Sequence, residues 1–246
     1  MKVLIVGLGN LGMFLVRHFV ESGFKVFGDD INFDKHGELC KLGGSWWDYS
    51  EVDIVIFALF PKQIEKWAKT VSEIPKKALF VNVTSVQLLG LQALKNVGVE
   101  ETRIFSFHPL FGPVVITKSG WAGKQIIVTV QPEGDERASL LLKTFRDKGV
   151  TVDTMSPPEH DMIMLPHALA FLIAELVKAG TIYTYTDPRF LTGSGRHMLG
   201  LLDFTEACSL ELRNLILSNP VLRSSLIFQR FRNVLDVIEK EQGHRQ

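Results

Sequence analysis

Short runs of β-branched and aromatic residues alternate with helically patterned segments up to about residue 155. The runs that predict strands are Val3–Val6, Lys25–Gly28, Val52–Leu59, Ala78–Val83, Ile104–Phe107, Gln125–Val130 and Val150–Met155. The segments that predict helices are Asn10–Ser22, Lys62–Ile74, Leu88–Val97 and Gly134–Lys148. This alternation predicts an α/β fold with a doubly wound parallel sheet, Rossmann-like in its topology.

The pattern changes after the proline pair Pro157-Pro158. Beyond it the β signal is weak and apolar residues recur at helical spacing. The helical stretches predicted there are Leu165–Leu176, His197–Leu217 and Val221–Glu239. We therefore predict two domains: residues 1–156 form the sheet domain, and residues 157–246 form an all-helical C-terminal domain.

Composition narrows the class of protein. The chain has 246 residues, 46% of them hydrophobic, and a formal net charge of zero. This balance gives no electrostatic basis for binding nucleic acid or an anionic membrane; the partner we expect, from the motifs described below, is a small-molecule substrate. Cys40 and Cys208 are too few and too far apart in sequence for a disulfide framework or a zinc site, and no metal is expected. With no secretory signal pattern at the start, we expect a cytoplasmic protein.

The first predicted strand runs directly into a glycine-rich turn. Gly7, Gly9 and Gly12 have the G-x-G-x-x-G spacing, with Asn10 and Leu11 between the last two, and a helical pattern follows. Such a turn lets the backbone approach a pyrophosphate and points a helix N-terminus at its charge.

The second predicted strand ends in Asp29-Asp30, and Asp30 lies 18 residues after Gly12. A carboxylate there can accept hydrogen bonds from the ribose hydroxyls of NAD and would repel the 2′-phosphate of NADP. The cofactor predicted is NAD, bound by the glycine turn and by Asp30.

Two further loops follow predicted strands at the same edge of the sheet. Ser85 comes after Ala78–Val83, and His108 comes after Ile104–Phe107, at the start of a loop. In a dehydrogenase a histidine can accept the proton of a substrate hydroxyl while a serine orients that hydroxyl. Each residue also has a structural interpretation, since serine often caps a turn or helix and histidine is often a hydrogen-bonded structural residue. Beside a dinucleotide motif, both become catalytic candidates.

The other histidines that bear on the argument are His18, His160 and His167. We expect His18 on the surface of the first helix, and His160 at the start of the helical domain beside a residue of capping type. His167 lies in an apolar helical stretch, where it is either a satisfied core histidine or a substrate ligand.

Four motifs occur here in the order and spacing of one family. They are Gly7-Leu8-Gly9-Asn10-Leu11-Gly12, Val83-Thr84-Ser85-Val86, His108-Pro109-Leu110-Phe111-Gly112-Pro113 and Glu159-His160-Asp161. Through them the chain resembles the prephenate/arogenate dehydrogenases of tyrosine biosynthesis across almost its whole length.

The resemblance implies an NAD(P)-dependent oxidative decarboxylation. Prephenate would give 4-hydroxyphenylpyruvate, and arogenate would give tyrosine. It also implies that His108 binds the ring hydroxyl, that Ser85 supports it, and that the helical domain lines the substrate site and pairs two subunits into a homodimer. His167, Arg213 and Arg196 are the substrate-binding candidates, either arginine being able to hold a substrate carboxylate.

The chain departs from the family at two positions near Ser85. The family commonly has Asp at the position of Asn82 and Lys at that of Gln87, so two charges are missing here. This loss keeps open a dinucleotide-binding sensor or pseudoenzyme. A related NAD(P)-dependent imine or 2-keto acid reductase is the other alternative, although the His-Pro-Leu-Phe-Gly-Pro segment is not expected there.

Overall fold

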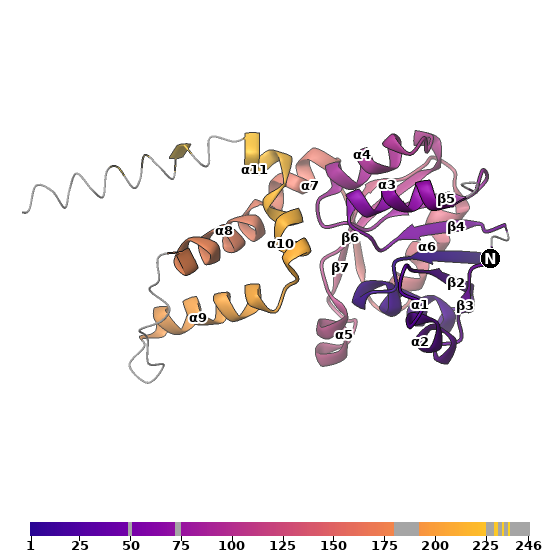
Figure 1. Ribbon diagram of the computed structural model, residues 1–246, viewed down its shortest axis with the longest axis horizontal. Helices are drawn as coiled ribbons and strands as arrows, with labels where there is room; N and C mark the ends of the chain where they lie inside the picture. The colour runs from indigo at the N-terminus through magenta and orange to yellow at the C-terminus, as the bar shows by residue number, and fades with distance from the viewer. Residues whose placement is uncertain are drawn as a thin grey trace, which may run out of the picture. The chain divides into compact units, whose positions relative to one another are not determined.

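The computed structural model describes residues 1–48, 51–71, 75–179 and 192–224, together with Gln229, Arg230, Asn233 and Asp236. It divides into two compact units, residues 1–160 and residues 161–246 (Figure 1).

The described residues of the first unit form an eight-stranded sheet in the order β3-β2-β1-β4-β5-β6-β7-β8. The strands are β1 (Lys2–Val6), β2 (Lys25–Asp29), β3 (Ser45–Trp46), β4 (Ile54–Phe57), β5 (Leu79–Asn82), β6 (Ile104–Pro109), β7 (Gln125–Val130) and β8 (Thr151–Thr154). Strands β1 to β6 are parallel, whereas β7 runs antiparallel to β6 and β8 runs parallel to β7. The predicted α/β, Rossmann-like class is confirmed, with the last two strands reversed.

The helices of this unit cover both faces of the sheet. They are α1 (Asn10–Glu21), α2 (Lys35–Lys41), α3 (Pro61–Thr70), α4 (Gln87–Asn96), a 3₁₀ turn (Glu101–Arg103), α5 (Pro113–Ser119), α6 (Glu136–Arg146) and the start of α7 (Pro157–Ile163). Alternate residues of β1 belong to two separate cores, Val3 and Ile5 to one and Leu4 and Val6 to the other. Helices α1 and α6 pack on the first core, and α3 and α4 pack on the second (Figure 1). Burial on both faces explains why β1 and β4 are continuously apolar.

The short elements β3, α2 and α5 were not predicted, because two to seven residues carry too little periodicity to stand out. Residues 72–74 of the predicted helix Lys62–Ile74 lie outside the described part, and α3 ends at Thr70.

His18 is buried, so its predicted place on the surface was wrong. Its side chain is 1% exposed, its Nε2 lies 2.8 Å from Thr144 Oγ1, and its ring stacks on Phe145 at a centroid distance of 4.3 Å. Burial lowers the pKa of His18 to about 4, with a smaller contribution from Lys148. Position 18 shares the buried stripe of α1 with Leu15, three residues earlier, and α6 covers that stripe.

The second unit contains the end of α7 and the described helices α8 (Leu165–Ala179), α9 (Gly193–Glu206), α10 (Leu210–Leu217) and α11 (Pro220–Ser224). The helix predicted over His197–Leu217 is divided in two, because Ser209 accepts a hydrogen bond from Leu212 N–H at 3.2 Å and starts α10 as its N-cap. Most of the predicted helix Val221–Glu239 lies outside the described residues.

Ala168, Phe171, Ile216 and Leu222 form a buried apolar cluster among the described helices of this unit, where Ala174 and Leu202 are also buried. Within the described ranges no single helix combines the length and apolarity needed to cross a membrane; α7 and α8 meet the criteria only as a pair bent by 43°.

Candidate active site

The candidate functional residues lie at the carboxyl ends of several parallel strands. The glycine turn follows β1, Asp30 follows β2, Ser85 follows β5, and His108 lies near the end of β6. Since β1 pairs with both β2 and β4, the chain reverses its direction of winding at β1. In open α/β sheets ligands bind outside the carboxyl ends of the strands at such a switch point. This edge is therefore the candidate site.

Backbone geometry requires two of the three glycines in the turn. Gly7 has φ +92°, and a Cβ there would lie 2.6 Å from Leu59 Cδ2. A Cβ at Gly12 would lie 1.8 Å from the carbonyl oxygen of Gly7, which no side chain could tolerate. At Gly9, the N-cap of α1, a Cβ would meet no atom within 4 Å. The first turn of α1, which begins with Asn10 and Leu11, therefore has open space before it, as phosphate binding requires.

The two neighbouring aspartates make different contacts. Asp29 Oδ2 accepts a hydrogen bond from the Trp67 indole N–H at 2.6 Å. Asp30 Oδ2 accepts one from Leu8 N–H, inside the glycine turn, at 2.6 Å, and its Oδ1 accepts one from Asn32 N–H at 2.8 Å. A carboxylate can accept about four hydrogen bonds, so the two that Asp30 accepts leave lone pairs available. Asp30 is thus held beside the turn with capacity for further donors, such as ribose hydroxyls.

His108 lies in a strand, because β6 continues through Pro109 and pairs His108 with Ile127 of β7. The loop expected to begin at His108 therefore begins later. The residue is 8% exposed, and its Nδ1 lies 3.0 Å from Nε2 of His160. The structure thus brings together two histidines 52 residues apart in the sequence. The sequence placed His160 at the start of the helical domain beside a residue of capping type and did not predict this contact; the Glu159-His160-Asp161 motif was the available signal.

A buried polar network lies next to Ser85. Asn82 Nδ2 donates to Ser106 Oγ at 2.8 Å, and Ser106 Oγ donates to Gln87 Oε1 at 2.5 Å. Gln87 Oε1 also accepts from Thr129 Oγ1 at 2.6 Å, and Gln87 Nε2 donates to the carbonyl of Thr84 at 2.5 Å.

Asn82, Gln87 and Ser106 have no exposed surface. Asn82 and Gln87, where the family commonly has Asp and Lys, are therefore linked through Ser106 by uncharged groups that are hydrogen-bonded to one another. Ser85 is half-buried in the turn between β5 and α4 that this network holds.

The substrate-binding candidates lie in the second unit and are dispersed among its helices. His167 starts α8 half-buried, packs beside Phe171 and Phe204, and has its pKa lowered by burial. Arg213 Nη1 of α10 donates to Glu175 Oε1 at 3.1 Å. Glu175 is about 12 Å beyond His167 along α8, at 1.5 Å per residue. Arg196 is exposed on α9. The described contacts therefore do not gather His167, Arg213 and Arg196 at one point.

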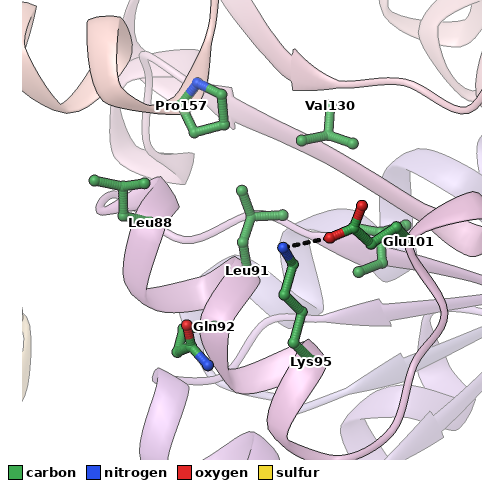
Figure 2. Close-up of a pocket in the computed structure, with 8 residues that line it drawn as sticks. Leu88, Leu91, Gln92, Lys95, Glu101, Val130 and Pro157 are labelled. Atoms are coloured by element: carbon green, nitrogen blue, oxygen red, sulfur yellow. Dashed lines mark ion pairs between the residues drawn. The ribbon is translucent and has the colours of Figure 1, made fainter.

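A cavity of about 270 Å³ lies elsewhere in the first unit, beside α4 (Figure 2). Apolar side chains, among them Leu88 and Leu91, line much of it. Lys95 Nζ and Glu101 Oε1 form an ion pair at 2.5 Å within it (Figure 2). None of the candidate site residues lines this cavity, so it contributes nothing to the site at the sheet edge.

A doubly wound sheet with a tight glycine turn after its first strand and an acidic residue after its second is the arrangement of the Rossmann-like dinucleotide-binding folds. No family model matches the chain. In sequence it is 26% identical over 195 residues to arogenate dehydrogenase 1, chloroplastic, of Arabidopsis thaliana, a match covering 72% of this chain and 30% of that protein. It is 22% identical over 260 residues to arogenate dehydrogenase 2, chloroplastic, of the same plant, covering 98% of this chain and 70% of that protein.

Its fold is similar to that of the prephenate dehydrogenase of Aquifex aeolicus, solved with hydroxyphenyl propionate and NAD⁺. The TM-score is 0.70 at 23% identity, over 99% of this chain and 92% of that one. The resemblance to prephenate/arogenate dehydrogenases is thus confirmed.

Proposed function

We propose that this chain catalyses the NAD-dependent oxidative decarboxylation of prephenate to 4-hydroxyphenylpyruvate, or of arogenate to tyrosine. The observation that carries the proposal is His108, buried at the carboxyl edge of the sheet that bears the glycine turn, in a chain similar to arogenate dehydrogenases. The Aquifex protein, similar in fold, was solved with NAD⁺ and a hydroxyphenyl ligand.

The residues present fit NAD. The open space before α1 at Gly9 suits a pyrophosphate, and the clamped carboxylate of Asp30 suits the ribose hydroxyls. When bound, NAD supplies the hydride acceptor for the ring carbon that carries the hydroxyl. No metal ion is needed for this chemistry.

The protein's own groups handle the proton. His108 takes the proton of the ring hydroxyl as the carbon is oxidised, and Ser85 orients that hydroxyl. The bond to the ring carboxylate then breaks, CO₂ leaves, and the electron pair of that bond restores the aromatic ring. His108 returns the proton to the ring oxygen. For the dianionic substrate we propose His167 and either Arg213 or Arg196 as ligands in the helical unit.

The experiment that tests the proposal measures NADH formation with prephenate and with arogenate, each against NAD and NADP. We expect turnover of at least one substrate with NAD. Turnover of neither, with imine or 2-keto acid reduction instead, would establish the reductase alternative. NAD binding by calorimetry without any turnover would establish a sensor or pseudoenzyme.

We also propose a homodimer formed through the helical unit. Large apolar side chains, including Leu176, Phe204 and Leu210, are more than half exposed there, and the buried core among the described helices is small. We propose a reducing, cytoplasmic setting, which suits the unpaired thiols of Cys40 and Cys208.

A further inference from the structure

His160 makes a direct contact with the proposed catalytic base. Its side chain is fully buried, and its Nε2 lies 3.0 Å from His108 Nδ1. The ring centroids are 5.1 Å apart and the planes meet at 75°, an edge-on arrangement. The two rings are therefore joined by a hydrogen bond between nitrogens and are not stacked.

The start of α7 holds His160 in place. Ser156 Oγ donates to Glu159 Oε2 at 2.6 Å, Ser156 N–H donates to the same oxygen at 2.9 Å, and Glu159 N–H donates to Ser156 Oγ at 3.4 Å. This reciprocal pattern is a capping box, and Pro157 begins the helix inside it. His160 is the next residue, with its N–H bonded to the Ser156 carbonyl at 2.9 Å. Its backbone is thus fixed on two sides before its ring meets His108.

The hydrogen bond links the tautomers of the two rings. A neutral imidazole has one N–H and one acceptor nitrogen, so one ring must donate and the other accept. A base that accepts a substrate proton at Nε2 needs its own hydrogen on Nδ1. In the contact with His160, His108 Nδ1–H then donates to His160 Nε2.

We propose that His160 is a positioning residue that holds His108 in the Nδ1–H tautomer and aims its Nε2 at the substrate hydroxyl. This inference rests on the proposed function, because it takes His108 as the base. The physical role is the one a carboxylate fills in a serine-protease triad, where the wrong tautomer costs about 10⁴ in kcat. Here the partner is a neutral imidazole, whose hydrogen bond is weaker than that of a carboxylate.

Two substitutions of equal polarity and different length test the inference. The amide of His160→Gln reaches about as far as Nε2 and can accept the Nδ1–H bond, whereas the shorter amide of His160→Asn stops near the position of Nδ1. We expect kcat to fall on the order of 10–100-fold in His160→Asn and to stay within about threefold of wild type in His160→Gln. KM for substrate and for NAD should change little in either. Equal losses in both variants, or losses confined to KM, would overturn a positioning role.

A spectroscopic readout separates this inference from the proposed function. Long-range ¹H–¹⁵N correlation of ¹⁵N-histidine protein reports which ring nitrogen carries the hydrogen, and His108→Asn assigns the signal. We expect Nδ1–H for His108 in wild type and in His160→Gln, and a shift toward Nε2–H in His160→Asn. A wild-type His108 carrying its hydrogen on Nε2 would overturn the inference. Since the spectrum needs no turnover, absence of prephenate and arogenate oxidation would overturn the proposed function alone.

Discussion

His108 combines a strand position with burial at the candidate site, and its replacement gives the clearest residue-scale prediction. His108→Asn should retain NAD binding and a cooperative unfolding transition. We expect kcat to fall on the order of 10²–10⁴-fold, the range for a positioned general base. Stopped-flow or steady-state NADH formation measures the loss, and calorimetry with NAD is the control. Near-normal kcat with either substrate would remove His108 from the chemistry.

Asp30 sets the second prediction at this scale, because its carboxylate is clamped beside the glycine turn. The preference for NAD is the ratio of kcat/KM with NAD to kcat/KM with NADP. Asp30→Ala should lower this ratio by a factor on the order of ten or more. The reason is that a carboxylate beside the 2′-phosphate costs several kcal/mol. Asp29→Asn is the matched control, since it keeps an acceptor for the Trp67 indole. A wild type that reduces NADP as efficiently as NAD would contradict this placement of Asp30.

At the scale of elements, a neutral network joins β5, α4, β6 and β7 through Asn82, Gln87, Ser106 and Thr129. Asn82→Asp or Gln87→Lys alone places an unpaired charge at a fully buried position. Each single change should lower the free energy of unfolding by about 3 kcal/mol. The double change restores opposite charges and should recover much of that loss. Urea unfolding of the four proteins gives the coupling energy, and additive losses would refute the pairing.

The packing of α1 against α6 predicts a pH dependence of stability through His18. Its pKa is about 4 in the folded protein and near 6.5 in the unfolded chain. Between these values the unfolded chain binds a proton that the folded protein does not, so stability falls as the pH drops from 6.5 to 4. The loss amounts to about 3 kcal/mol and is absent above pH 6.5.

His18→Gln removes this titration and should flatten the dependence measured by urea unfolding between pH 7.5 and pH 4.5. The exposed His36, changed to Gln, is the control and should leave the slope unaltered. An equal slope in wild type and His18→Gln would mean that other groups cause it.

The whole-molecule prediction concerns assembly. We expect wild type to sediment as a dimer at micromolar concentration, because the helical unit exposes large apolar side chains. Leu176→Glu, on α8, should shift the protein toward the monomer. Leu140→Glu, on α6 of the sheet unit, is an exposed leucine changed in the same way and should leave the dimer intact. A wild-type monomer, or equal effects of both substitutions, would refute the proposed interface.

The sequence by itself determined the sheet domain and its glycine turn. Every strand longer than two residues was predicted. For β4, β5 and β6 the reason is burial on both faces, which leaves largely apolar runs that are visible locally, whereas the mostly exposed edge strand β8 was predicted from its β-branched residues. The glycine spacing was equally visible, since the tight turn requires glycine at Gly7 and Gly12, only a few positions apart. Helices α1, α3, α4 and α6 were predicted for the same reason, because their periodicity lies within a single segment.

Only the tertiary structure decided which distant groups meet. It made β7 antiparallel to β6, and it buried His18 under α6. It gave the neighbouring Asp29 and Asp30 different hydrogen-bond partners, and it placed His160 against His108. Apart from the Glu159-His160-Asp161 motif around His160, these outcomes have no local signature, because each depends on a partner far along the chain. From the sequence we expected His18 on the surface of the first helix and His160 beside a residue of capping type at the start of the helical domain. Packing brought both into the interior, where each ring has a hydrogen-bonding partner.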